Sequence, residues 1–327
     1  MRSEIVEMFR KQPGEYLSGE EISRRLTVSR TAIWKHMQAL KSEGYDIEAH
    51  PRLGYRLRQT PDLMLPGEIE ACLTTSFLGR NIHYRAAFPV STNDIAKQLA
   101  EAGCPEGQIV VAETQAGGRG RLTRNWFSPY AKGIWFSLVL RPNFRLQDAP
   151  KCTLLAAVAV NKAIKKVAGI DSGIKWPNDI LYQDKKLVGI LTEMSAQIDG
   201  INYVVIGIGI NVNIEKEEFP SELKESATSL LIAAGHPISR LELLQEVLAE
   251  IEKLYNDTKS KGFAQILDEW RIQSLTLGHI VDVFGLGHEF SGRAIDIDAD
   301  GALLVDTGAA IEKVMAGDVS IRYKKGL

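Results

Sequence analysis

The residues most suggestive of chemistry form a glycine- and arginine-rich segment in the first half of the chain, Gln115 to Trp126. The segment reads QAGGRGRLTRNW, with an amide before the glycines and an indole after the arginines. Arg119 and Arg121 can neutralise an anion or a phosphate that gains negative charge during a reaction. The spacing of a Walker A phosphate loop is absent, so the segment predicts an anion-binding loop of another kind.

Two further polar segments lie within predicted helices and strands of the same region. STND, which contains Ser91 and Thr92, stands where a helix begins, and its hydroxyl groups either cap that helix or bind a ligand. GIGIN, from Gly207 to Asn211, puts two glycines inside a strand, which weakens it unless something must approach the backbone closely. GIGIN lacks the spacing of a dinucleotide-binding fingerprint, so we reject a Rossmann site there.

A fourth polar segment, KWPNDI, presents side chains on a turn between strands. Asn178 and Asp179 follow Lys175 in this turn, and Lys186 comes soon afterwards in LYQDKK. A plain turn uses Pro-Asn-Asp for its backbone geometry alone. Two explanations therefore remain open for KWPNDI, a structural turn and a turn that carries functional groups.

Together the four segments predict one kind of chemistry. The two loop arginines and Lys186 supply positive charge, Trp126 offers a face for stacking, and Asn211 offers the amide pattern that recognises adenine. Asp179 is a candidate base or metal ligand. Neither a Ser-His-Asp set nor a reactive cysteine is evident in the sequence. The predicted reaction is therefore an adenylation by positioning and charge neutralisation, without a covalent enzyme intermediate.

An α/β domain built around one sheet must position these segments. Apolar stretches with strand character cover 108–115, 133–142, 185–194 and 202–213. Helices are predicted over 152–169 and, with strong amphipathic character, over 241–262.

The first 60 residues predict a separate module made of two helices and a hairpin. Ser18 can cap a helix over 19–26, and Ser29 can cap a second helix that stops at Gly44. The alternating stretch 45–58 is typical of a β-hairpin. Helix, turn, helix and hairpin in this order form the winged-helix pattern.

The winged-helix pattern predicts DNA binding, and a basic surface that binds protein is the alternative. Residues 1–60 hold 11 Lys and Arg against 8 Asp and Glu, a net charge of +3, whereas the remainder holds 28 against 33, a net charge of −5. The candidate DNA-contacting residues on the second helix and the hairpin are Ser29, Arg30, Thr31, Lys35, Gln38, Arg52 and Arg56.

The sequence predicts three domains and an α/β (α+β) fold class. A linker bracketed by Pro61 and Pro66 ends a winged helix-turn-helix domain at 1–62. The catalytic region is expected over 63–272, as a mixed α/β domain around one sheet. About five short strands over 273–327 predict a small SH3-like β-barrel, for which a structural role is favoured over support of ligand binding.

Composition narrows the cellular setting of the protein. Of its 327 residues 45% are hydrophobic and 24% charged, as in soluble globular proteins. No apolar run approaches the roughly 18 residues of a membrane span, and Glu4 and Glu7 stand where a signal peptide is apolar. Three widely spaced cysteines without Cys-x-x-Cys favour the reducing cytoplasm and argue against zinc. We therefore expect a cytoplasmic protein.

The four segments, in this order behind a winged-helix module, resemble the signatures of the biotin–protein ligases. The matching motifs are STND, GGRGR followed by Trp126, KWPNDI followed by KKLVGIL, and GIGINVN. The N-terminal module makes the chain similar to the bifunctional bacterial form, which also represses biotin synthesis genes. The resemblance spans essentially the whole chain.

The resemblance implies a two-step reaction. Biotin and Mg-ATP give biotinyl-5′-adenylate, which then acylates one lysine of a biotin carrier domain. The implied cofactors are ATP, biotin and Mg²⁺. The implied partners are the carrier domain of biotin-dependent carboxylases, operator DNA, and a second copy of the chain once the adenylate is bound.

The resemblance also implies roles for individual residues. Lys186, Arg119 and Asp179 would be catalytic, with Asp179 orienting or deprotonating the incoming lysine. Biotin would contact Ser91, Thr92, Gln115, Gly118, Arg119, Arg121, Lys186, Gly189 and Gly207. ATP and the adenylate would contact Arg119, Arg121, Trp126, Lys175, Asn178, Lys186 and Asn211. The role of Arg124 stays undefined, and 213–235 shows no evident counterpart of a second aromatic that covers adenine in some relatives.

Two other functions compete with this interpretation. A pure transcription regulator would sense biotin or its adenylate without catalysis, but such a sensor need not keep Lys186, Asp179 and the loop arginines. A lipoate-type ligase shares the chemistry, and the KWPND and GGRGR motifs disfavour it.

Overall fold

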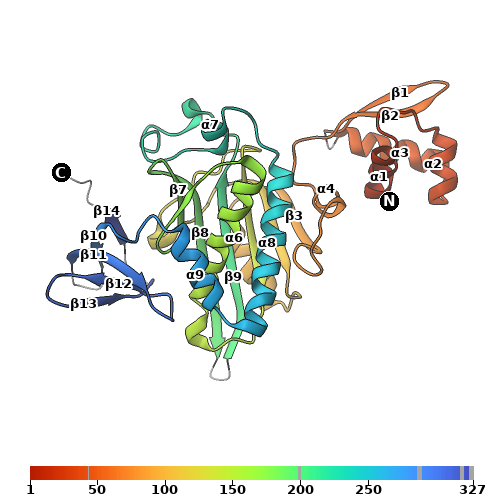
Figure 1. Cartoon of the computed structure of the whole chain (residues 1–327). Helices are drawn as coiled ribbons and strands as arrows, with labels where there is room; N and C mark the ends of the chain where they lie inside the picture. The colour runs from red at the N-terminus through yellow and green to blue at the C-terminus, as the bar shows by residue number, and fades with distance from the viewer. Residues whose placement is uncertain (43, 198–199, 286–288, 317–319, 324–327) are drawn as a thin grey trace. The chain divides into compact units, whose positions relative to one another are not determined.

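The computed structural model describes residues 1–42, 44–197, 200–285, 289–316 and 320–323. The chain divides into two compact units, Met1–Cys72 and Leu73–Leu327 (Figure 1). Among the described residues, no helix combines the length and apolar character that crossing a membrane requires.

The first unit contains the predicted helices and hairpin. The side chain of Ser18 accepts a hydrogen bond from the backbone N–H of Glu21 and caps the helix Gly19–Leu26, as predicted. The Ser29 hydroxyl accepts from the N–H of Ala32 at the start of the third helix. Thr27 adopts a left-handed conformation in the turn between these helices. The elements are α1 (Arg2–Lys11), α2 (Gly19–Leu26), α3 (Arg30–Ser42), β1 (Asp46–His50), β2 (Gly54–Gln59) and α4 (Pro66–Ala71).

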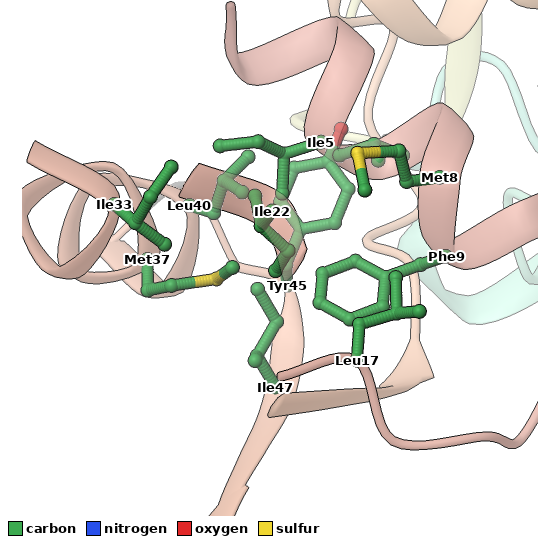
Figure 2. Close-up of a cluster of buried hydrophobic side chains, with 11 residues drawn as sticks. Ile5, Met8, Phe9, Leu17, Ile22, Ile33, Met37, Leu40, Tyr45 and Ile47 are labelled. Atoms are coloured by element: carbon green, nitrogen blue, oxygen red, sulfur yellow. The ribbon is translucent and has the colours of Figure 1, made fainter. Parts of the chain in front are cut away.

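One hydrophobic core holds this unit together (Figure 2). Ile33, Met37 and Leu40 on α3 are buried in it, which confirms the predicted inward face of that helix. At the edge of the unit, the buried carboxylate of Glu68 on α4 accepts hydrogen bonds from Arg10 and from the hydroxyl of Tyr45. The core residues labelled in Figure 2 are Ile5, Met8, Phe9, Leu17, Ile22, Ile33, Met37, Leu40, Tyr45 and Ile47.

The second unit is built on a seven-stranded sheet in the order β3-β4-β5-β9-β8-β7-β6. The β3–β4 pair is parallel, and every other neighbouring pair is antiparallel. The strands are β3 (Asn81–Phe88), β4 (Gln108–Gln115), β5 (Gly133–Leu140), β6 (Gly173–Lys175), β7 (Asp179–Tyr182), β8 (Lys185–Gln197) and β9 (Gly200–Asn211). The predicted strands therefore meet in one sheet, as expected.

Helices pack on this sheet and complete its core. α5 (Thr92–Glu101) contributes Ala96 and Ala100 to a cluster with Val110, Ala112 and Val139 from the strands. α6 (Lys151–Ala168) and α8 (Arg240–Lys261) lie side by side against the sheet (Figure 1). The shorter helices of this unit are α7 (Leu230–Ala234) and α9 (Ala264–Gln273).

The last part of the chain forms a small antiparallel sheet in the order β13-β12-β11-β10-β14. The expected SH3-like domain is present as this sheet, but over the described residues the edge strands β13 and β14 pair with inner strands and not with each other. The sheet is thus open in this part of the structure. Its strands are β10 (Ile280–Phe284), β11 (Phe290–Ile297), β12 (Leu303–Asp306), β13 (Ile311–Val314) and β14 (Ser320–Tyr323).

Candidate active site

A pocket of about 480 Å³ lies on the second unit and gathers residues from segments that are far apart in the sequence. Every residue predicted for the ligase reaction lines it except Gly118. A Cβ atom at Gly118 would lie 2.6 Å from the backbone oxygen of Trp126, so Gly118 lets the two ends of the glycine-arginine loop pack together. The predicted residues that line the pocket are Ser91, Thr92, Gln115, Arg119, Arg121, Trp126, Lys175, Asn178, Asp179, Lys186, Gly189, Gly207 and Asn211.

One part of the pocket is built from a polar network of buried Ser91, Thr92, Asn93 and Ser137 with half-buried Gln115, which we call the network end. The Ser91 side chain caps α5 by accepting from the N–H of Asn93, while Ser91 also lines the pocket. The backbone N–H of Thr92 donates to Oε1 of Gln115 at 2.7 Å. The capping alternative for STND is therefore confirmed, and because the segment also lines the cavity, its binding of a ligand stays a prediction.

Asn93 and Ser137 hold this network in place, and neither residue was predicted. Nδ2 of Asn93 donates to the carbonyl oxygen of Leu191 at 3.2 Å. The Ser137 hydroxyl lies 2.6 Å from Oδ1 of Asn93 and 2.7 Å from Oγ1 of Thr92. A Cβ atom at Gly207 would come within 2.1 Å of Oδ1 of Asn93. The close approach that GIGIN predicted is thus made by the protein's own Asn93.

Another part of the pocket wall, which we call the loop end, carries Trp126, Lys186, Arg119 and Arg121. Arg119 adjoins the network end, because its guanidinium and Nδ2 of Asn93 both contact Oε2 of Glu193. The indole of Trp126 packs on Gly189 and Gly209, which are register partners on β8 and β9. Cβ atoms at these glycines would lie 2.6 and 2.5 Å from indole atoms. Among the described residues no hydrogen-bond partner meets the buried indole nitrogen of Trp126.

Lys186 combines two contacts at the loop end. Its ammonium group lies 2.7 Å from Oδ1 of Asp179 and 5.3 Å from the centroid of the Trp126 ring. The β7–β8 pairing brings Asp179 beside Gly189, and the β6–β7 pairing brings it beside Lys175. The KWPNDI turn thus brings Asn178 and Asp179 to the wall of the pocket, and their functional role stays a prediction.

Arg121 links the loop to two other parts of the unit. One guanidinium nitrogen donates to Oδ1 of Asn178 at 3.1 Å, and another donates to the carbonyl oxygen of Ala316 at 3.0 Å. The fully buried Trp176 donates its indole N–H to the carbonyl oxygen of Gly301 at 3.1 Å. The C-terminal sheet therefore contacts both the KWPNDI turn and the glycine-arginine loop.

Arg119 lies at the rim of the pocket, with 38% of its side chain exposed. It forms ion pairs with Asp94 on α5 and with Glu193 on β8. Lys97 also donates to Glu193, at 2.9 Å. Burial raises the pKa of Glu193, but the hydrogen bonds from Lys97 and Asn93 outweigh burial, so the pKa lies below its ordinary value of 4.5.

Asn211 and an unpredicted aromatic residue stand near Trp126. Nδ2 of the buried Asn211 donates to the carbonyl oxygen of Thr228 at 3.0 Å. Phe219 lines the pocket and lies 6.2 Å from Phe127 between ring centroids. Residues 213–235 contain no tryptophan and so showed no evident counterpart of a second adenine-covering aromatic; the phenylalanine at 219 was the available signal. Arg124, whose role was undefined, also lines the pocket.

The predicted DNA-contacting residues lie on the surface of the first unit. Ser29, Arg30, Thr31, Lys35, Gln38 and Arg52 are exposed. Arg30 pairs with Glu20, an acid of α2. Arg56 is only partly exposed.

The guanidinium of Arg56 is already engaged within the module. It donates to Glu48 at 3.0 Å and lies over the ring of Tyr16. The hydrogen bond from Arg56, followed by that from Tyr16, lowers the pKa of Glu48 to about 2. Arg56 thus holds the hairpin against the module.

The search for metal ligands covers only the described residues. Within them, no group of three His, Cys, Asp or Glu side chains is arranged to hold a metal ion. His279 is exposed, and His288 lies outside the described residues.

Comparisons with known proteins agree with this arrangement. Residues 86–211 match the Biotin/lipoate A/B protein ligase family, 2–56 match an HTH domain, and 276–322 match the Biotin protein ligase C terminal domain. The chain is 44% identical to the Bifunctional ligase/repressor BirA of Bacillus subtilis over 98% of both chains. It is 30% identical to that of Escherichia coli over 94% of both.

A solved structure also resembles the fold. The biotin protein ligase of Aquifex aeolicus in complex with biotin and ATP matches with a TM-score of 0.66 and 32% identity. The match covers 75% of this chain and 100% of that one. The chain therefore belongs to the biotin protein ligase family, in the form that carries a helix-turn-helix domain.

Proposed function

We propose that this protein is an ATP-dependent biotin–protein ligase and a biotin-responsive repressor of biotin synthesis genes. One observation carries the ligase proposal: a single pocket brings a polar network, most of it buried, together with Lys186 and the loop arginines. The network suits a neutral ring with N–H and carbonyl groups, and the cations suit a carboxylate that meets phosphate.

The network end would bind the ureido ring of biotin. Oδ1 of Asn93 can only accept, so the Ser137 proton points to it, and Thr92 then donates its own proton to Ser137. Thr92 keeps an acceptor lone pair for a ureido N–H. Ser91 and Gln115 would complete the binding of the ring, with the backbones of Gly189 and Gly207 along the ligand, while Gly118 would act indirectly by letting the loop pack together.

The loop end would carry the adenylation step. A carboxylate oxygen of biotin attacks the α-phosphorus of ATP, the bond to the β-phosphate oxygen breaks, and pyrophosphate leaves. Lys186, Arg119 and Arg121 would neutralise the charge that develops on the phosphate oxygens. Lys175 and Asn178, which line the same wall, would contact the nucleotide. Mg²⁺ would enter with ATP, because this ion is bound mainly through substrate phosphates.

The adenine would lie against Trp126 and Phe219. Nδ2 of Asn211 is used by Thr228, so its oxygen would accept a hydrogen bond from the exocyclic amine of adenine. Covering the base also covers the mixed anhydride, which water would otherwise hydrolyse.

The second step would transfer biotin to a carrier lysine. The lysine amine attacks the acyl carbon, the bond to the phosphate oxygen breaks, and AMP leaves. Asp179, which pairs with Lys186 at 2.7 Å, would orient the amine or accept its proton. The acceptor would be the carrier domain of a biotin-dependent carboxylase.

The regulatory function would belong to the N-terminal module. Its third helix would enter the major groove with Ser29, Arg30, Thr31, Lys35 and Gln38, and Arg52 would contact the backbone from the hairpin. Arg56 would contact a DNA phosphate after its hydrogen bonds to Glu48 are broken. Adenylate binding would favour a homodimer that spans two half-sites. The proposed domains are 1–62, 63–272 and 273–327, and the proposed compartment is the cytoplasm.

Mass spectrometry of a biotin carrier domain tests the ligase proposal. The carrier is incubated with this protein, biotin and Mg-ATP, and the expected result is one ATP-dependent biotinyl group on each carrier over many turnovers. Removing residues 1–62 should leave this activity intact and abolish operator binding. A protein that binds biotin tightly and never modifies the carrier would be a sensor without catalysis, and the ligase proposal would fail.

A further inference from the structure

Helix α3 presents two faces of different character. Ile33, Met37 and Leu40 point into the core of the first unit (Figure 2). The opposite face is exposed and carries a tryptophan among its polar residues, namely Arg30, Thr31, Trp34, Lys35 and Gln38. These positions fall on one side of the helix because a turn takes about 3.6 residues.

Trp34 is unusual among the tryptophans of this chain. Its side chain is 54% exposed, whereas Trp135, Trp176 and Trp270 are fully buried and Trp126 packs on two glycines. An indole contributes a large apolar area when it is covered, so leaving it in water forgoes a major stabilising contribution. The core of this module is complete without it. The position of Trp34 therefore points to a partner outside the module.

The charge of α3 indicates which partner this is. The helix contains Arg30, Lys35 and Lys41 and has neither aspartate nor glutamate. Glu20 of α2 pairs with Arg30, but both side chains are about 70% exposed, and such surface pairs are weak and readily exchanged. A cationic face free of its own acids fits a polyanion, and a helix of this size fits the major groove of duplex DNA.

We propose that Trp34 is a base-reading residue whose indole packs on the 5-methyl group of thymine in the major groove. The methyl group is the apolar feature that distinguishes thymine there, and apolar side chains recognise it by contact. The flanking Arg30 and Lys35 would hold the backbone and so fix the position of the indole. This inference rests on the proposed DNA-binding function and assigns it a recognition chemistry.

The experiment uses the full chain with biotin and Mg-ATP. The wild-type protein first selects duplexes from a random-sequence library. Affinity is then measured for a selected duplex, for a scrambled duplex, and for the selected duplex with deoxyuridine in place of thymidine, all at one salt concentration. The variants are Trp34→Ala, Trp34→Phe and, as a control on the same helix, Ser42→Ala. Unfolding temperature and carrier biotinylation confirm that each variant is folded.

Trp34→Ala should bind the selected duplex roughly tenfold more weakly and the scrambled duplex with unchanged affinity, because one base contact is lost. Deoxyuridine should weaken the wild type by a similar factor and leave Trp34→Ala unaffected. Trp34→Phe should bind with intermediate affinity, and Ser42→Ala should match the wild type.

Three results would overturn the inference while the DNA-binding function stands. They are unchanged affinity of Trp34→Ala for the selected duplex, equal losses on the selected and scrambled duplexes, and equal weakening of both proteins by deoxyuridine. Unchanged affinity of Trp34→Ala for the selected duplex would indicate that the indole contacts a protein partner instead. A wild-type chain that selects no duplex would overturn both the inference and the proposed repressor function.

Discussion

The two ends of the pocket are built on different principles. At the network end, Thr92, Asn93 and Ser137 are buried and hydrogen-bonded to one another at 2.6 to 2.7 Å. At the loop end, the Arg119 side chain is 38% exposed and forms ion pairs with Asp94 and Glu193, which are partly exposed themselves. The network end is preorganised before any ligand arrives, whereas the loop end must exchange its partners.

This difference matches the demands of the two ligand parts. Buried groups that are already oriented bind a neutral ring without further ordering cost, and they reject ligands that leave them unpaired. Charges that act on a reacting phosphate must release their ground-state partners first. We therefore expect substitutions at the network end to change biotin affinity and substitutions at the loop end to change the ATP-dependent step.

The largest effect is expected for Lys186→Ala. Removing the cation that meets the phosphate oxygens should slow adenylate formation by about 10²–10³-fold and leave biotin affinity nearly unchanged. Pyrophosphate release with biotin and Mg-ATP measures the rate. Lys185→Ala is a matched control, since both lysine side chains are 35% exposed and Lys185 pairs with Glu225 instead. Similar rates of pyrophosphate release for the two variants would show that Lys186 does not take part in adenylate formation.

Trp126→Ala should have the next largest effect. Losing a stacking surface costs roughly 1–3 kcal/mol for each base, so the KM for ATP should rise about tenfold or more. Trp126→Phe should restore most of the loss, because a smaller ring still packs on Gly189 and Gly209. Steady-state kinetics of pyrophosphate release separates KM from kcat. Biotin affinity that falls in parallel would mean that the indole belongs to both ends of the pocket.

Much of the site could be predicted because its motifs are continuous in sequence. Ser91 stands at a helix start, and 108–115 has the apolar run of a strand, so both elements follow from local pattern. Ser137 and Ala316 could not be predicted in this way. Ser137 meets Asn93 across 44 residues, and Ala316 meets Arg121 across 195. Such contacts depend on strand order, which local sequence leaves undetermined.

The same limit explains two differences from the expected fold. A run of short strands in the sequence predicts an antiparallel sheet. Whether that sheet closes into a barrel depends on which edge strands pair, and the sequence pattern does not determine this. Over the described residues the expected barrel is an open sheet. Phe219 is visible in the sequence as an aromatic residue, but its position in the pocket is not. It acquires its place only when its loop folds beside Phe127.

Ser137→Ala should weaken biotin binding by a smaller factor, roughly threefold to tenfold. The substitution leaves Oδ1 of Asn93 without its donor and frees Thr92 to turn, and an unpaired buried group costs about 1–3 kcal/mol of stability. Calorimetry with biotin and thermal unfolding measure the two effects. Rates of adenylate formation at saturating biotin should stay close to wild type. A fall in those rates would contradict the separation of the two ends.

The smallest effect concerns stability and pH at Glu193. Its pKa is lowered in the folded protein, so its stabilising contribution is present above the unfolded value of 4.5 and is lost as pH falls through the folded value. Glu193→Gln should therefore melt below the wild type near neutral pH, and the difference should shrink on acidification. Glu225→Gln, whose side chain is 88% exposed, is the control. A difference in unfolding temperature that persists at acidic pH would mean that Glu193 stabilises the fold by packing and not by its charge.

Biotin calorimetry on Gly207→Ala and Gly209→Ala tests the division of the pocket most directly. The two glycines lie two residues apart on β9, yet a Cβ atom at Gly207 would meet Asn93 at 2.1 Å and one at Gly209 would meet Trp126 at 2.5 Å. Gly207→Ala should weaken biotin binding by about tenfold or more, and Gly209→Ala should retain it while impairing adenylate formation. Equal losses of biotin affinity, or an unaffected Gly207→Ala, would contradict the account.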